Sequence, residues 1–192
     1  MIEKISFLLA NKLVQNTNES NADTDDLEIL IYGIECIINT FIPIIFFLVY
    51  SLYNHIFFEM LCWFISFISL RNIIGGYHAN SHSSCIIFSS IYGLLSLFSL
   101  QYISHIVLYI KIVILVTIFV IHIIFTPIIH HAEKQSNIYI TRTKYCIKNM
   151  LLVFATLVTF FHFYMPSISN AIILGMINAE LLFIVEKIKL AF

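Results

Sequence analysis

Long apolar runs constrain this chain more than any other feature of its sequence. Of its 192 residues, 60% are hydrophobic and only 11% are charged, whereas an average soluble domain carries about 25% charged residues. A run of about 20 apolar residues is long enough to cross the hydrocarbon core of a bilayer as a helix. Five glycines and three prolines provide little turn material for a β-barrel. The sequence therefore predicts an all-α integral membrane protein.

Six membrane spans can be assigned along the chain. One apolar run, 85–126, is too long for a single crossing of a core about 30 Å thick, so we expect it to break near the polar residues 101–105 and to cross twice. The predicted spans are 27–50, 56–70, the two halves of 85–126, 150–165 and 168–185. Together they form a predicted transmembrane domain over residues 27–192, with a polar loop before residue 150.

The N-terminal segment 1–15 has a different pattern. Apolar residues recur at helical spacing, with polar residues between them, which is typical of an amphipathic helix lying on the membrane surface. The apolar positions are Ile2, Ile5, Leu8, Leu9 and Leu13. We expect no cleavable signal peptide, because a small-residue cleavage site is missing. The acidic segment 16–26 is predicted to be a linker.

The basic residues predict an orientation. With the N-terminus in the cytoplasm, nine of the ten Lys and Arg residues fall in cytoplasmic segments, and Lys111 is the exception. The nine are Lys4, Lys12, Arg71, Lys134, Arg142, Lys144, Lys148, Lys187 and Lys189. This asymmetry predicts six transmembrane helices with both termini cytoplasmic. The net charge of −1 argues against nucleic acid as a partner.

A polar segment, 71–85, interrupts the apolar runs on the predicted cytoplasmic side. Polar groups between membrane spans are costly and therefore indicate function. The segment contains Arg71, Gly75, Gly76, His78, His82 and Cys85. A cysteine beside a histidine is the arrangement of a thiol nucleophile and its base. Cys85 also opens a predicted helix, whose N-terminal N–H groups stabilise anions such as a thiolate.

Two histidines compete for the role of base. His82 precedes Cys85 by three residues, so the two side chains would touch on a continuous helix. His78 precedes Cys85 by seven residues, about 10 Å along a helix axis, and reaches the thiol only if the chain bends. The glycine pair before His78 favours such a turn. Spacing alone nevertheless favours His82.

The pattern Arg71-x3-Gly75-Gly76-x-His78-Ala79, followed by six residues and Cys85, resembles the accessory gene regulator protein B (AgrB) family. Its members are membrane cysteine endopeptidases that cut the precursor of a cyclic quorum-sensing peptide and close its thiolactone ring. The six-span layout, the N-terminal amphipathic helix and a second short segment at 126–134 also belong to the resemblance.

The resemblance implies roles that spacing does not. It makes Cys85 the nucleophile and His78 the base, which reverses the preference for His82. Arg71, Gly75 and Gly76 would support the site by charge and by turn geometry. It further implies a short membrane-bound precursor peptide as the substrate, a homodimer, and a location in the bacterial cell membrane with the active site on the cytoplasmic side. No cofactor is implied.

Ionisable residues within the predicted spans leave an alternative open. They are Glu35, Glu59, His122 and Glu180. Glu35 is a candidate acid to orient the catalytic histidine, but a hydrogen-bonded contact between helices also explains it. All four together would form the polar pathway of a transporter or channel subunit, although no internal repeat supports that alternative. A non-catalytic scaffold is a third interpretation.

The remaining cysteines and histidines give no strong signal for a metal. Cys36 and Cys62 lie in apolar spans and are expected to be packing residues, and Cys146 is expected to be an ordinary thiol in the polar loop. The sequence has neither a CxxC nor an HExxH motif, so no metal site is predicted. The trio of His78, His82 and Cys85 is one metal-binding alternative. His130 and His131 with Glu133 are another, but adjacent histidines point to different faces of a helix.

Overall fold

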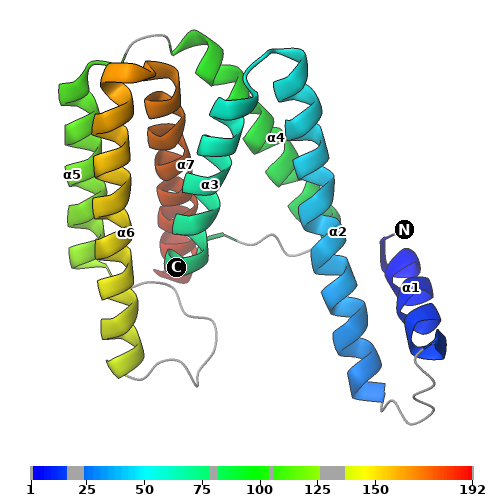
Figure 1. Cartoon of the computed structure of the whole chain (residues 1–192). Helices are drawn as coiled ribbons and strands as arrows, with labels where there is room; N and C mark the ends of the chain where they lie inside the picture. Colours follow the sequence, from blue (N-terminus) through cyan, green and yellow to red (C-terminus); the bar gives the residue numbers. More distant parts are fainter. Residues whose placement is uncertain (1, 17–23, 78–81, 104–105, 126–136, 192) are drawn as a thin grey trace. The chain divides into compact units, whose positions relative to one another are not determined.

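The computed structural model describes residues 2–16, 24–77, 82–103, 106–125 and 137–191, and the regular secondary structure within these ranges is entirely α-helical. The helices are α1 (Ile2–Asn16), α2 (Thr24–Tyr53), α3 (Phe57–Ile74), α4 (His82–Tyr102), α5 (Leu108–Ile124), α6 (Asn137–Tyr164) and α7 (Pro166–Ala191) (Figure 1). The predicted all-α architecture is confirmed for these residues.

Five of the described helices are long and apolar enough to cross a membrane. The qualifying segments are Leu27–Tyr53, Phe57–Ile74, Ser84–Tyr102, Ile140–Tyr164 and Pro166–Ala191. Helix α5 is apolar but has only 17 residues. The break expected near 101–105 is present, because α4 ends at Tyr102 and α5 begins at Leu108. Five of the six predicted spans thus have the length of a crossing, and the sixth is a shorter apolar helix.

The predicted polar loop before residue 150 is wrong for residues 137–149, which form the first turns of α6. The hydropathy pattern does not reveal these turns, because their basic residues lower the mean hydropathy. Basic residues are nevertheless compatible with a helix. Ile147 and Leu151 are buried and lie four residues apart, so they extend the buried stripe of α6 into its basic part. Cys146 therefore lies on a helix, where it is exposed.

The predicted linker 16–26 is also partly helical. Helix α1 ends at Asn16 and α2 begins at Thr24, so helical structure reaches into both ends of the linker. Residues 17–23 lie outside the described residues.

The chain divides into two units, Met1–Tyr50 with Ala79–Leu95 and Ser51–His78 with Ser96–Phe192. In the second unit the core surrounds α7, which packs against α3, α5 and α6 (Figure 1). Helix α7 is buried around most of its circumference, with Ile173, Met176 and Phe183 almost completely enclosed. A helix that is buried on all sides is the central element of its bundle.

In the first unit, α1 contacts the protein through its small residues. Ser6 and Ala10 are fully buried, whereas the apolar residues predicted to face the membrane are exposed where their side chains are described. These exposed residues are Ile5, Leu8, Leu9 and Leu13. An apolar face that the protein leaves uncovered is what a helix on a bilayer surface requires.

Candidate active site and a buried polar centre

The polar segment begins where α3 ends, at Gly75. This residue has φ 78° and ψ −171°, a backbone conformation that is essentially restricted to glycine. Its N–H donates a hydrogen bond of 3.0 Å to the carbonyl oxygen of Arg71, which closes the last turn of the helix. The helix therefore breaks at the glycine pair, as the turn signal predicts.

Within the second unit, the residues after Gly75 are held against α7. The Arg71 guanidinium folds over the helix end, where Nη2 donates to the carbonyl oxygen of Tyr77 at 3.0 Å. The backbone N–H of Tyr77 donates to the carbonyl oxygen of Leu182 on α7 at 3.1 Å. Lys189 places its ammonium 5.3 Å from the centroid of the Tyr77 ring. These contacts fix the path of the chain just before His78.

Cys85 lies in the first turn of α4 and is a partly buried free thiol. Its carbonyl oxygen accepts a hydrogen bond of 2.7 Å from Ser89 Oγ. The first four N–H groups of a helix have no partner within the helix and attract negative charge. His82 begins the same helix, three residues before Cys85. Residues 78–81 lie outside the described residues, so the predicted pair of His78 and Cys85 stays a prediction.

Glu35 is buried in the first unit, where it contacts α1. Its Oε1 accepts a hydrogen bond of 3.1 Å from Ser6 Oγ. Ser6 was not among the sequence candidates, although a serine among the apolar residues of an amphipathic helix is a signal for such a contact. The role of Glu35 as the orienting acid remains a prediction.

The structure pairs two of the four ionisable residues of the transporter alternative. His122 Nε2 on α5 lies 2.5 Å from Glu180 Oε1 on α7, and the two side chains are only 4% and 5% exposed. Among the described residues, His122 Nδ1 and Glu180 Oε2 have no hydrogen-bond partner. The other two residues lie elsewhere: Glu59 is in the first turn of α3, and Glu35 bonds Ser6 as above.

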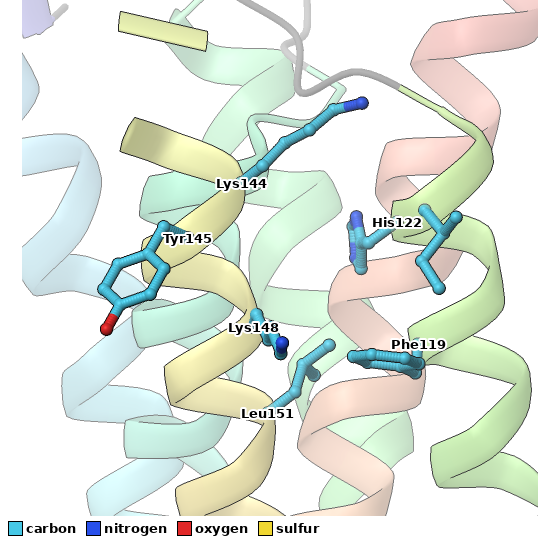
Figure 2. Close-up of a pocket in the computed structure, with 7 residues that line it drawn as sticks. Phe119, His122, Lys144, Tyr145, Lys148 and Leu151 are labelled. Carbon is cyan, nitrogen blue, oxygen red and sulfur yellow. The ribbon is translucent and has the colours of Figure 1, made fainter. Parts of the chain in front are cut away.

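A cavity of about 340 Å³ lies between α5 and α6, beside this pair (Figure 2). Its lining residues are Phe119, His122, Ile123, Lys144, Tyr145, Lys148 and Leu151. The walls are mainly apolar, and the lysines come from the basic first turns of α6. Neither lysine forms an ion pair with a carboxylate in the part of the chain that the structure describes.

The described side chains contain no group of three His, Cys, Asp or Glu residues that would hold a metal ion. The trio of His78, His82 and Cys85 falls partly outside them, so the metal-binding alternative is not decided by this observation.

The sequence profile described as accessory gene regulator B matches residues 6–185. The chain belongs to the accessory gene regulator B family. The resemblance expected from the segment Arg71 to Cys85 is thus confirmed, and the match also covers α1 from Ser6 and most of α7.

AgrB-like protein 2 of Clostridium perfringens is 38% identical over 85 residues, which are 44% of this chain and 38% of that protein. The chain thus spans well under half of that relative's length. No solved structure matches the chain.

Proposed function

We propose that this chain is a membrane cysteine endopeptidase that cleaves the precursor of an autoinducing peptide and closes its ring. Membership of the accessory gene regulator B family links the chain to the processing of such peptides. The observation that carries the proposal is the position of Cys85, a free and partly buried thiol in the first turn of α4. A nucleophilic cysteine needs such an anion-stabilising position and a base.

The proposed reaction has two transfers of an acyl group. The Cys85 sulfur attacks a peptide carbonyl of an AgrD-like precursor, and His78 takes the thiol proton and delivers it to the leaving amine. The C–N bond breaks and an acyl-enzyme thioester remains. A thiol of the same precursor then attacks the thioester and closes the macrocycle. The Cys85 thiolate leaves and regains its proton, so no oxidant or cofactor is needed.

Water competes with the precursor thiol for the acyl-enzyme. Ring closure is faster than hydrolysis of the acyl-enzyme only if the precursor is held with its thiol close to the thioester and water is kept out. The chain just before the proposed base is braced, because Arg71 bonds Tyr77 and Tyr77 bonds Leu182 on α7.

We further propose that α5 is the sixth crossing. Its 17 residues extend about 25 Å at 1.5 Å per residue, which is near the lower limit for a span. Six crossings return both termini to the cytoplasm and place the segment 71–85 on the same side. The homodimer implied by the family remains a prediction.

Co-expression of the chain with a tagged candidate precursor tests the proposal. We expect Cys85→Ala to abolish cleavage, while Cys146→Ala, which removes an exposed thiol on α6, retains it. Continued cleavage by Cys85→Ala would overturn the protease assignment.

The same assay identifies the base. Under the proposal, His78→Ala is inactive and His82→Ala retains cleavage. The reverse result would show that the i, i+3 neighbour on α4 is the base, and would leave the nucleophile assignment intact.

A further inference from the structure

We propose that the cavity between α5 and α6 binds one anionic phospholipid. Figure 2 shows Lys144, Lys148 and Leu151 on α6, with Phe119 and His122 on the facing α5. The cavity lies at the end of the second unit where α5 ends and the apolar part of α6 begins. With the orientation proposed above this is the cytoplasmic leaflet, but binding itself does not depend on that orientation or on protease activity.

Among the described residues, the two lysines of the cavity have no acidic partner. Lys144 and Lys148 are four residues apart and therefore lie on the same face of α6, where like charges repel. The described lining of the cavity contains no acidic residue, and neither lysine is paired with a described carboxylate. A bound anion would relieve the repulsion.

His122 supplies a polar contact in the cavity, between the levels of Lys144 and Lys148 in the view of Figure 2. His122 is buried, and its Nδ1 has no partner among the described residues, while Nε2 is engaged by Glu180. A buried nitrogen normally has a hydrogen-bond partner. Phosphate or glycerol oxygens of a lipid headgroup can provide one.

The apolar side of the cavity distinguishes a lipid from a soluble anion. Phe119, Ile123 and Leu151 form a wall next to the lysines, and Ile123 is 61% exposed on the outer surface of α5. A soluble phosphate would use the lysines alone. A phospholipid uses both sides, with its headgroup on the lysines and an acyl chain along the wall. Basic pockets between transmembrane helices bind anionic headgroups in this way.

Native mass spectrometry of the full chain in a mild detergent tests the proposal. The probes are phosphatidylglycerol, phosphatidylcholine with the same acyl chains, and inorganic phosphate. We expect phosphatidylglycerol to be retained preferentially. In Lys144→Gln/Lys148→Gln its affinity should fall about 25-fold, since each lysine near an anionic headgroup contributes about fivefold.

The matched control is Arg142→Gln/Lys187→Gln, which removes two charges near the same end of the second unit but none from the cavity. It should retain most of the affinity. A second variant, Ile123→Trp, fills the apolar wall, leaves both lysines in place, and should also weaken lipid binding.

Three results would overturn the proposal. Equal losses in the two double variants would indicate general electrostatic attraction. Equal retention of phosphatidylcholine would remove the headgroup preference. The third result is displacement of the bound lipid by a competitor. Inorganic phosphate that displaces the lipid at a similar concentration would identify a soluble anion as the occupant. An acidic peptide that displaces it, with no effect of Ile123→Trp on binding, would identify a peptide as the occupant.

Discussion

Gly75 has a backbone conformation that is unfavourable for any residue with a side chain. Substitution of this one residue therefore tests whether the site needs that conformation. At φ 78°, Gly75→Ala should cost about 1–3 kcal/mol of local strain and shift the chain path between α3 and His78. We expect thermal unfolding of the purified chain at a lower temperature and a strong loss of precursor cleavage.

Gly76→Ala is the matched control for this prediction. A Cβ at Gly76 would lie 3.5 Å from Leu182 Cβ, an ordinary contact, and its backbone has no positive φ. The loss of stability and of cleavage should therefore be clearly smaller. Equal effects of the two substitutions would show that the site needs the absence of side chains, not the conformation of Gly75.

The pair of His122 and Glu180 is expected to stabilise the bundle through its mutual contact. His122→Leu alone leaves the Glu180 carboxyl buried without its partner, which costs about 1–3 kcal/mol. His122→Leu/Glu180→Leu removes both polar groups and should recover much of that loss. Unfolding temperatures of the two variants in one detergent provide the measurement.

The same two variants address the transporter alternative. If the pair is structural, cleavage per folded chain stays near the wild-type value in the double variant. A stable double variant that has lost peptide processing would instead assign the pair a functional role.

At the scale of helices, α3 and α7 pack closely against each other at Gly175. A Cβ on this residue would overlap Ser66 Oγ and the backbone carbonyl oxygen of Trp63. Small residues permit such close approaches between membrane helices. We expect Gly175→Ala to destabilise the second unit by about 1–3 kcal/mol, measured as a lower unfolding temperature.

Gly33→Ala is the control for Gly175→Ala, because nothing lies within 4 Å of a Cβ at Gly33 in α2. Since alanine favours a helix interior over glycine by about 0.5–1 kcal/mol, this variant should be neutral or slightly more stable. If both variants lose stability alike, the crossing of α3 and α7 is not as close as described.

Much of the helical layout was predictable because hydropathy reports the length of apolar runs directly. The break after Tyr102 follows from the polar residues there, and the division between the last two spans follows from Pro166, which begins α7. The first turns of α6 were not predicted, because Arg142, Lys144 and Lys148 make them polar. A hydropathy pattern does not detect a polar helix. Their buried stripe is recognisable only from the four-residue spacing of Ile147 and Leu151.

The residues of the candidate site can be named from the sequence, but the contacts that the structure gives them cannot. Arg71 and Gly75 stand out in the sequence as a charge and a glycine pair beside an apolar run. The bond from Arg71 to Tyr77 depends on the fold, and so does the bond from Tyr77 to Leu182. The pairs of Ser6 with Glu35 and of His122 with Glu180 join positions 29 and 58 residues apart, and no local pattern records such a pairing.

At the scale of the whole molecule, the one basic residue that opposed the predicted orientation has a structural explanation. Lys111 is 0% exposed and donates a hydrogen bond of 2.8 Å to Ser169 Oγ at the start of α7. The positive-inside rule concerns charges in loops that face the aqueous phase. A lysine enclosed by the bundle therefore does not count against cytoplasmic termini.

A topology with six crossings and a topology with five place each end of α6 on opposite sides of the membrane. With α5 as a crossing, Thr141 faces the cytoplasm and Ser167 faces the outside. Without it, the two positions exchange sides, because α6 would then run in the reverse direction. Both residues are exposed, so single cysteines at these positions, in a chain whose four native cysteines are replaced by alanine, report the side directly.

In intact cells, a membrane-impermeant maleimide should label Ser167→Cys and leave Thr141→Cys unlabelled, because the nine basic residues in the predicted cytoplasmic segments oppose the reverse orientation. Asn72→Cys, exposed near the end of α3, should be protected in either arrangement and label only after permeabilisation. Labelling of Thr141→Cys with protection of Ser167→Cys would mean that α5 does not cross. The basic turns of α6, with Lys144 and Lys148, would then face the outside, and the proposed lipid would come from the outer leaflet.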